Sequence, residues 1–305
     1  MLTEKLRRLG IVPVVRIEDS KDAVSLANAL SDGGLPIVEI TFRSDAAIKS
    51  IEYISKECPD VLVGAGTVIS LSQLDMAIDA GASFVVTPGF NETVVKACID
   101  KGIPIFPGCT NPNDIESAMS LGINIVKFFP AEHAGGIQAI KALSAPYSNI
   151  NFLPTGGINI KNLNDYLSFS RVIACGGSWM VDTSLISSGN FAEITRLTIQ
   201  AVRTMLGLHL SDINVYYKND EDVEKTAKTL ESLFLFEYKA ERIFHILLNS
   251  SEKAGCFDIG TGCLKRAEYH LRRQNIPILE VKNNMIILDI DLNGFSVRLV
   301  KNREH

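Results

Sequence analysis

The first two thirds of the chain alternate between short apolar segments and longer amphipathic ones. The short segments, rich in Val, Ile and Phe, predict strands at Ile11–Ile17, Pro36–Phe42, Val61–Thr67, Phe84–Pro88, Pro104–Gly108, Ile125–Pro130, Asn151–Gly157 and Val172–Ser178. Apolar residues recur at helical spacing between them, in Ser20–Leu30, Ala46–Lys56, Leu71–Ala80, Glu92–Lys101, Pro112–Leu121 and a last helix, Phe191–Leu206. Repeated strand–helix units in a segment of this length predict an α/β fold, a compact (β/α)8 TIM barrel. The rival is a doubly wound open sheet, whose Gly-rich fingerprint is absent after the first strand.

Polar residues and glycines gather at the carboxyl ends of these predicted strands. Barrel enzymes build their active sites at that end, because the loops that follow the strands converge there. The sequence therefore predicts a functional site at one end of the barrel. In chain order, the residues concerned are Arg16, Glu39, Thr41, Arg43, Gly66, Thr67, Thr87, Pro88, Gly108, Lys127, Thr155, Gly156, Gly157, Gly177 and Ser178.

Lys127 stands inside the apolar segment Ile125–Pro130, which predicts a buried strand. Removing a lysine from water favours its neutral amine. A neutral amine attacks ketones, and Schiff-base lysines form in this way. A lysine that snorkels from a strand end, or that contacts an anion, would leave the same pattern. These residues alone leave the three interpretations open.

Glu39 is the second candidate for chemistry. Strand alternation places Glu39, Thr41 and Arg43 on one face and the neighbouring apolar residues on the other. A carboxylate that faces a barrel interior is costly unless it is paired. Glu39 is therefore either half of a structural ion pair with Lys127 or Arg43, or a general base beside Lys127. We favour the general base, because ionisable groups with perturbed pKa values cluster at functional sites.

Two glycine pairs follow the seventh and eighth predicted strands. Glycines let backbone N–H groups approach an anion, and the start of a following helix would add a favourable dipole. Ser178 adds a hydroxyl donor after the second pair. Barrels often bind phosphate between these two loops. The pairs therefore predict a phosphate site.

The composition excludes several classes of protein. A net charge of −5 argues against a nucleic-acid partner, which would require a basic face. No apolar run is long enough to span a bilayer, and the first residues lack a secretory pattern, so we expect a cytoplasmic protein without a membrane partner. The six cysteines form no C-x-x-C pair and are expected to be reduced thiols.

Five segments of the chain together resemble the class I 2-keto-3-deoxy-6-phosphogluconate (KDPG) aldolases, which often also cleave 4-hydroxy-2-oxoglutarate (KHG). The resemblance covers residues 1–206. The segments are Val38–Arg43, Gly64–Val68, Lys127–Glu132, Pro154–Ile158 and Gly176–Trp179.

The resemblance implies a homotrimer of TIM barrels with a small-molecule substrate. It implies a Schiff base between Lys127 and pyruvate, Glu39 as the proton shuttle, and neither cofactor nor metal; residues 1–206 contain one histidine, His133. Thr87 departs from the serine that many members carry before Pro-Gly, but it keeps a hydroxyl. By the same match Arg43, Thr67 and Gly66 bind the pyruvyl carboxylate; Gly156, Gly157, Gly177 and Ser178 bind the distal phosphate; and Arg16, Thr87, Pro88, Phe129 and Thr155 are further pocket residues.

The function so predicted is a carbon–carbon lyase of carbohydrate metabolism in the Entner–Doudoroff pathway. It would cleave KDPG to pyruvate and glyceraldehyde 3-phosphate, and KHG to pyruvate and glyoxylate. One alternative is a non-catalytic barrel that senses a keto acid or phosphate and reports through the rest of the chain. Another is a different phosphate-binding barrel, such as an epimerase or isomerase. The pair of Lys127 with Glu39 argues against the sensor. Arg43 and Thr67 argue against the epimerase or isomerase, because they fit the carboxylate of a keto acid better.

Residues 207–305 have another rhythm, which predicts a small α+β domain of two βαβββ-like repeats. Asn283-Asn284 and Asn293-Gly294 are typical of hairpin turns. This pattern resembles the glyoxalase/bleomycin-resistance (vicinal oxygen chelate) superfamily. The first repeat comprises Ile213–Tyr217, helix Asp220–Phe234, Phe236–Ala240 and Arg242–Leu248; the second comprises Cys256–Ile259, helix Cys263–Gln274, Pro277–Lys282, Met285–Ile290 and Phe295–Val300.

Metal enzymes of that superfamily carry His and Glu ligands on their strands. The corresponding positions here are Asp212, Leu248, Cys256 and either Leu299 or Arg298. Leucine cannot bind a metal, so we expect no metal site. His209, His245 and His270 lack a ligand spacing and are expected to be packing or surface residues. A regulatory or subunit-contact module is the favoured role for this domain.

Overall fold

The computed structural model describes residues 2–217, 244–248 and 254–302. The chain divides into two compact units, Met1–Met205 and Leu206–His305. The helix expected at Asp220–Phe234 and the strand expected at Phe236–Ala240 lie outside the described residues.

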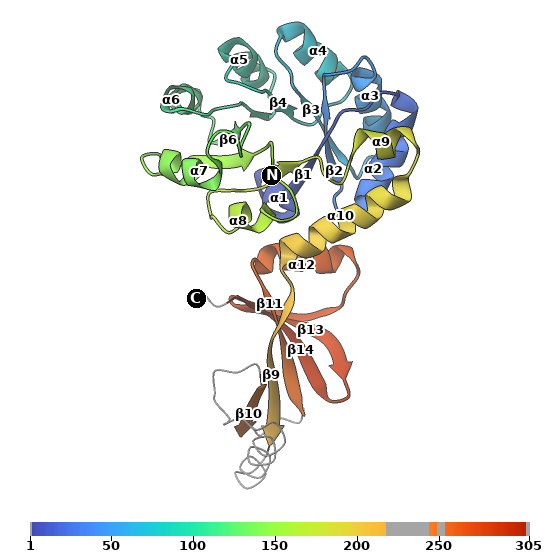
Figure 1. Ribbon diagram of the computed structural model, residues 1–305, viewed down its shortest axis with the longest axis vertical. Helices are drawn as coiled ribbons and strands as arrows, with labels where there is room; N and C mark the ends of the chain where they lie inside the picture. Colours follow the sequence, from blue (N-terminus) through green and yellow to red (C-terminus); the bar gives the residue numbers. More distant parts are fainter. Residues whose placement is uncertain (1, 218–243, 249–253, 303–305) are drawn as a thin grey trace. The chain divides into compact units, whose positions relative to one another are not determined.

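The first unit alternates strands with helices, and the helices surround the strands (Figure 1). The strands are β1 (Ile11–Val15), β2 (Ile37–Thr41), β3 (Leu62–Gly66), β4 (Val85–Val86), β5 (Ile105–Phe106), β6 (Ile125–Phe128), β7 (Asn151–Pro154) and β8 (Cys175–Gly177). The helices are α1 (Leu2–Leu9), η1 (Ser20–Asp22), α2 (Ala23–Asp32), α3 (Ala47–Glu57), α4 (Leu71–Asp79), α5 (Glu92–Asp100), α6 (Pro112–Ser120), α7 (Gly136–Ser144), α8 (Leu163–Leu167), α9 (Thr183–Ser187) and α10 (Phe191–Leu206).

Parallel pairing joins these strands into a curled sheet. One ladder has the order β5-β4-β3-β2-β1-β8, and β6 pairs with β7. Isolated parallel bridges continue the pairing from Gly108 to Lys127 and from Thr155 to Gly176, next to the ends of β5 and β7. The result is an α/β barrel, and the carboxyl ends of its strands meet at one end.

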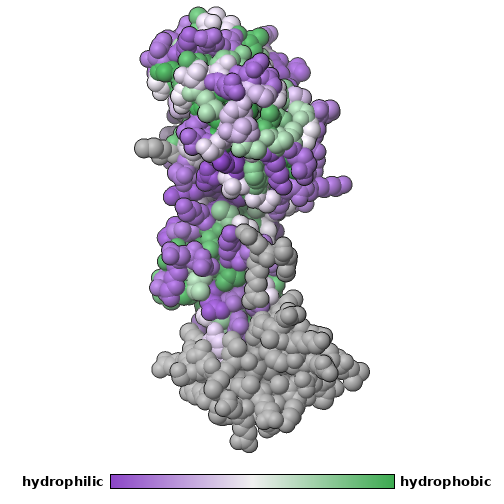
Figure 2. Space-filling model, turned by 90° about the vertical axis from the view of Figure 1, so that its left-hand side faces the viewer, coloured by the Kyte–Doolittle hydropathy of each residue, from purple (hydrophilic) through white to green (hydrophobic). Residues whose placement is uncertain are grey.

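The core of this unit follows from the hydrophobic pattern. All residues of β1, β2 and β6 are buried, as expected where helices cover a parallel sheet. Several helices begin at a side-chain cap: Ser70 accepts from Gln73 N and Asn91 from Val94 N. Hydrophilic residues predominate on the face of this unit drawn in Figure 2. The amphipathic helices thus point their polar sides to solvent.

The strands are shorter than the sequence predicts. The shortest strands are β4 and β5, each of which has two residues. Pro88 and Pro107 stand just past these strands, and proline has no N–H to donate to a ladder. The chain therefore leaves the sheet early and enters the loops that form the carboxyl end of the barrel.

The second unit contains a six-stranded sheet of order β10-β9-β11-β14-β13-β12. Its strand β11, helix α12 and antiparallel strands β12, β13 and β14 follow one another as a single βαβββ unit. Asn293 and Gly294 have φ values of 55° and 89°, which fit the predicted hairpin turn. The elements are β9 (His209–Tyr217), β10 (Phe244–Leu248), β11 (Gly255–Thr261), α12 (Leu264–Arg273), β12 (Ile278–Lys282), β13 (Met285–Leu292) and β14 (Phe295–Lys301).

Helix α12 covers one face of this sheet over β13 and β14. Ala267 and His270 of the helix are buried, together with Ile286 on β13 and Leu299 on β14. Because Ile286 is paired with Leu299 across the two strands, both side chains lie on the same face. The residues that alternate with them lie on the opposite face of the sheet.

Candidate active site

Lys127 and Glu39 contact each other inside the barrel. Lys127 lies on β6 and Glu39 on β2, and the two residues are 5% and 0% exposed. Nζ of Lys127 donates a hydrogen bond to Oε1 of Glu39 at 3.2 Å. The structure thus brings together the two side chains that the sequence singled out. Burying two charges costs free energy, and one hydrogen bond offsets only part of that cost.

The second carboxylate oxygen of Glu39 distinguishes this ion pair from a purely structural one. Oε2 is buried and has no hydrogen-bond partner among the described residues. Gly66, at the end of β3, leaves room for the carboxylate, because a Cβ atom there would lie 2.2 Å from Oε1. An unsatisfied buried acceptor is costly. The pair therefore offers an acceptor to a hydroxyl group or a water molecule.

Thr67 and Arg43 follow the strands next to this pair. Thr67 has a φ of 61°, a conformation that a β-branched residue rarely adopts. Backbone strain of this kind clusters at ligand sites. Nε of Arg43 donates to Oγ1 of Thr41 at 3.1 Å, and Thr41 in turn donates to the carbonyl of Val15 at 2.7 Å. These hydrogen bonds hold Nε of the exposed Arg43 side chain at the end of β2.

Phe129 and Arg16 differ in their position relative to the pair. Nζ of Lys127 lies 5.3 Å from the centroid of the Phe129 ring, within the range of a cation–π contact. Arg16 follows β1, is exposed, and forms an ion pair with Glu18 at 2.7 Å. Phe129 therefore flanks the amine, whereas Arg16 is engaged at the surface.

Thr87 and Pro88 form the turn after β4. The hydroxyl of Thr87 donates to the carbonyl of Gly89 at 2.7 Å and accepts from the N–H of Gly108 at 3.3 Å. A Cβ atom at Gly108 would lie 2.2 Å from the carbonyl oxygen of Pro88, so the two loops are in close contact. The hydroxyl of Thr87 thus links the backbone at Gly89 to the backbone at Gly108. Its role is to fix the conformation of these loops.

The loops after β7 and β8 are neighbours, because Thr155 and Gly176 form a bridge. Gly156 and Gly157 have φ values of 98° and 80°, in the region that favours glycine. Thr155 is buried, and its hydroxyl has no hydrogen-bond partner among the described residues. The loop after β7 therefore contains a hydroxyl that can bond to a ligand, that of Thr155. Its backbone at Gly156 and Gly157 adopts a conformation that favours glycine.

Gly177 and Ser178 lie at the end of β8. A Cβ atom at Gly177 would lie 1.9 Å from the ring of Trp179, so only glycine fits beside the indole. Ser178 is exposed. The helices that follow the two glycine loops, α8 and α9, have five residues each and begin well beyond the glycines. The expected contribution of a helix start stays a prediction, beside the donors that the loop N–H groups and hydroxyls supply.

Sequence reasoning missed a support beneath the first glycine loop. The hydroxyl of Tyr166 donates to Oε1 of Glu132, and a Cβ atom at Gly157 would lie 2.5 Å from Cγ of Glu132. Burial, followed by this hydrogen bond, raises the pKa of Tyr166 above its ordinary value. Glu132 belongs to the segment after Lys127, but nothing in the sequence points from it to a tyrosine on α8.

Within residues 2–217, 244–248 and 254–302, no group of three or more His, Cys, Asp or Glu side chains is placed to hold a metal ion. The same part of the chain contains no helix that is both long and apolar enough to cross a membrane.

The comparison with protein families agrees with this geometry. The model of the family described as KDPG and KHG aldolase matches residues 2–197. The chain belongs to this family. It is therefore an aldolase, a carbon–carbon lyase.

Relatives in the KDPG and KHG aldolase family are similar over nearly their full length. The 2-dehydro-3-deoxy-phosphogluconate aldolase of Treponema pallidum is 48% identical over 200 residues, 66% of this chain and 95% of that protein. The KHG/KDPG aldolase of Escherichia coli K12 is 40% identical over 192 residues, 63% of this chain and 90% of that protein. These matches leave about a third of this chain uncovered.

Solved structures of KDPG aldolases show the same fold. The enzyme of Legionella pneumophila, with pyruvate captured as a covalent carbinolamine intermediate, is 37% identical with a TM-score of 0.64 and covers 66% of this chain and 98% of that one. The enzyme of Zymomonas mobilis ZM4, with 3-phosphoglycerate, is 37% identical with a TM-score of 0.61 and covers 65% of this chain and 94% of that one.

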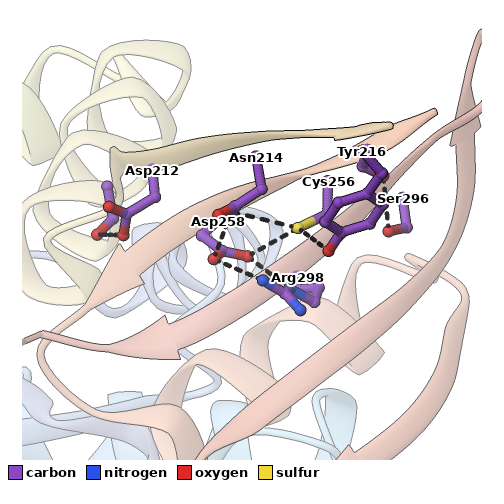
Figure 3. Close-up of polar contacts among 9 residues, drawn as sticks. Asp212, Asn214, Tyr216, Cys256, Asp258, Ser296 and Arg298 are labelled. Carbon is purple, nitrogen blue, oxygen red and sulfur yellow. Dashed lines mark hydrogen bonds and ion pairs between the residues drawn. The ribbon is translucent and has the colours of Figure 1, made fainter. Parts of the chain in front are cut away.

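The C-terminal unit, which lies outside the KDPG and KHG aldolase match, has a polar cluster of its own. Figure 3 shows its side chains on one side of the strands β9, β11 and β14. Both oxygens of Asp258 accept hydrogen bonds from Arg298, at 2.6 and 2.7 Å, and Asn214 donates to the same carboxylate at 3.1 Å. The hydroxyl of Tyr216 lies 3.1 Å from Sγ of the buried Cys256.

Three of the positions compared with the metal ligands of the glyoxalase superfamily, Asp212, Cys256 and Arg298, thus lie on one face of the sheet. Asn214, Tyr216 and Asp258 were not among the residues predicted from the sequence. The signal was present on β9, where Asp212, Asn214 and Tyr216 stand at every second position.

Proposed function

We propose that the barrel cleaves KDPG to pyruvate and glyceraldehyde 3-phosphate through a Schiff base on Lys127. The observation that carries this proposal is the buried contact between Lys127 and Glu39, with one oxygen of Glu39 left unsatisfied. The covalent carbinolamine of pyruvate in the Legionella enzyme supports it. The lysine itself supplies the chemistry, so the reaction requires neither a metal nor a cofactor.

The chemistry follows in four steps. Nζ of Lys127 attacks the C2 ketone, and loss of water gives an iminium, which withdraws electrons from the bond between C3 and C4. Glu39, through a water molecule, takes the proton of the C4 hydroxyl. The C3–C4 bond breaks and releases the aldehyde. The enamine of pyruvate is then protonated at C3, and hydrolysis of the iminium returns the free lysine.

The remaining residues divide between the two ends of the substrate. Arg43, Thr67 and Gly66 hold the pyruvyl carboxylate; the strained backbone at Thr67 supports this assignment. The loop donors around Gly156, Gly157, Gly177 and Ser178 hold the distal phosphate. The bridge between Thr155 and Gly176, which keeps these loops adjacent, supports that assignment. We further propose that the same site cleaves KHG, whose distal carboxylate would use the same donors.

Several features of organisation belong to the proposal. We propose a closed (β/α)8 barrel at residues 1–206, supported by the bridges next to the ends of β5 and β7. We also propose a homotrimer in the cytoplasm acting in the Entner–Doudoroff pathway. For residues 207–305 we propose a metal-free, glyoxalase-like domain of two repeats, supported by the one βαβββ unit that the structure describes.

The decisive experiment is reductive trapping. The full chain is incubated with pyruvate and borohydride, and its intact mass is measured. We expect one adduct of the reduced pyruvyl mass, mapped to Lys127 by peptide analysis and absent from Lys127→Ala. The exposed Lys96 on α5 provides the matched control, and Lys96→Ala should form the adduct as the wild type does.

Release of the two aldehydes from KDPG and KHG, measured with coupled dehydrogenases, then ranks the substrates. A wild-type chain that binds pyruvate but forms no adduct would contradict the proposal and would favour a keto-acid sensor instead.

A further inference from the structure

Strand β12 is the outer edge of the C-terminal sheet and carries an exposed apolar surface. It pairs with β13 on one side, and no described strand pairs with it on the other. Leu279 and Val281 are 68% and 45% exposed. Val281 is paired with Ile286, so its side chain lies on the face that α12 covers farther inward, over β13 and β14. The apolar face of the sheet thus continues beyond the helix to an open edge.

No described strand pairs with the outer backbone of this edge. Lys282 and Met285 close the two-residue turn Asn283-Asn284, so the N–H and C=O of Lys282 point toward β13. Backbone groups alternate in direction along a strand, so those of Glu280 also point toward β13. Those of Val281 point outward. Val281 therefore presents a donor and an acceptor at the same position, and no described strand pairs with either of them.

The charges on β12 are self-complementary in one register only. In an antiparallel pair of two β12 strands centred on Val281, Val281 faces Val281. Glu280 of each copy then faces Lys282 of the other. The two side chains are about half exposed and form an ion pair with each other at 3.0 Å within one copy. A register centred on Glu280 would instead place two glutamates opposite each other, which is unfavourable.

We propose that β12 is a docking edge for a second copy of this chain. The two-fold axis passes between the Val281 residues of the two copies. The two sheets become one continuous sheet, and the interface uses the same surface of both copies. Charged residues on an edge strand usually prevent such pairing. Here the opposite charges two positions apart neutralise each other across the axis, so they select this register.

Cysteine cross-linking tests the contact. In this register the Cα atoms of the two Val281 residues are about 5.5 Å apart, within the span of a disulfide. Mild oxidation of full-length Val281→Cys should give a covalent dimer on non-reducing gels. Leu292→Cys is the matched control, because Leu292 is 49% exposed at the end of β13. Wild type gives the background from the native cysteines. Equal dimer yields for Val281→Cys and Leu292→Cys would overturn the proposal.

Charge reversal tests the register and separates contact between copies from contact within one copy. Lys282→Glu alone and Glu280→Lys alone should each associate through β12 at least about tenfold more weakly than wild type, because like charges then face each other. An equimolar mixture of the two variants should restore association, although the charges within each chain are unchanged. Sedimentation velocity measures all three samples.

Association through the barrel does not involve these residues and should be the same in every sample. Wild-type association that neither single variant weakens, or a mixture that behaves as the average of its components, would overturn the proposal.

Discussion

The barrel contains a buried ion pair and the C-terminal unit a partly buried one, and the two pairs are built differently. In the barrel, Lys127 makes one hydrogen bond of 3.2 Å to Glu39, whose second oxygen has no partner among the described residues. In the C-terminal unit, Arg298 makes two hydrogen bonds of 2.6 and 2.7 Å to Asp258. Asn214 adds a third to the same carboxylate.

This difference shows how a buried ion pair can be assigned to chemistry or to structure. A complete pair has its donors and acceptors satisfied, so its charges fix the positions of the strands that carry them. An incomplete pair retains the cost of an unsatisfied atom, which a substrate or a water molecule can remove on binding. The barrel pair is therefore suited to reaction and the C-terminal pair to stability, and each assignment can be tested by breaking the pair.

The largest effect is expected from Glu39→Gln, which keeps the shape of the side chain and removes its basicity. Cleavage of KDPG should fall by about 10²- to 10⁴-fold in kcat, the usual contribution of a positioned acid–base group. Trapping of pyruvate on Lys127 should persist. The control is Asp258→Asn, which alters the other pair and should leave kcat unchanged. A kcat within threefold of wild type would mean that Glu39 moves no proton.

The second effect is on stability. Arg298→Met leaves the buried Asp258 carboxylate without its partner and should destabilise the C-terminal unit by about 3 kcal/mol. This is the low end of the usual range, because the Arg298 side chain keeps 26% of its surface exposed. The double variant Asp258→Leu with Arg298→Met should recover most of the loss.

Hydrogen exchange of the amides of β11 and β14 measures this change in the full chain, and kcat of the barrel should not change. Equal exchange in wild type and Arg298→Met would show that the pair adds no stability.

The third effect tests the position of the barrel pair without changing any charge. In Gly66→Ala the added methyl group would lie 2.2 Å from Oε1 of Glu39, so the carboxylate must move. Misplacement by about 1 Å can lower turnover by about 10²-fold. Gly89→Ala is the matched control, because a methyl group there meets no atom within 4 Å. If both alanine variants had the same kcat, Glu39 would not depend on Gly66 for its position.

The sequence predicts the barrel pair better than it predicts the C-terminal pair. An apolar context around Lys127 and strand alternation at Glu39 are local signals, and the barrel topology places the strand ends together. The contact of Asp258 with Arg298 instead depends on the parallel register of β11 and β14. No local pattern specifies that register.

The hydrophobic pattern alone does not predict some other features of the site, for physical reasons. The left-handed backbone of Thr67 results from its surroundings, because threonine does not favour that conformation by itself. Pro88 and Pro107 indicate that β4 and β5 end early, but the hydrophobic pattern alone extends the predicted strands to Pro88 and Gly108. The chemical roles assigned to Arg43, Thr67 and the glycine loops remain predictions.

The smallest effect concerns the edge of the C-terminal cluster. Burial raises the pKa of the Cys256 thiol, and the hydrogen bond with Tyr216 opposes this rise. Burial is also the main cause that raises the pKa of Tyr216 to about 12, so Tyr216 remains protonated and able to donate at neutral pH. Tyr216→Phe removes this bond, which should cost about 0.5–1.5 kcal/mol of stability. It should also raise the pKa of Cys256 further.

The alkylation rate of Cys256 as a function of pH, followed by peptide mass spectrometry, measures that pKa. The pH at which Cys256 begins to react should move upward in Tyr216→Phe, whereas Tyr269→Phe, a half-buried tyrosine on α12, should leave it unchanged. A variant that is less stable but has an unchanged pH profile would show that Tyr216 packs against the thiol without donating to it. In that case the satisfied part of the cluster would be limited to Asp258, Arg298 and Asn214, and the contrast with the barrel pair would rest on those three residues.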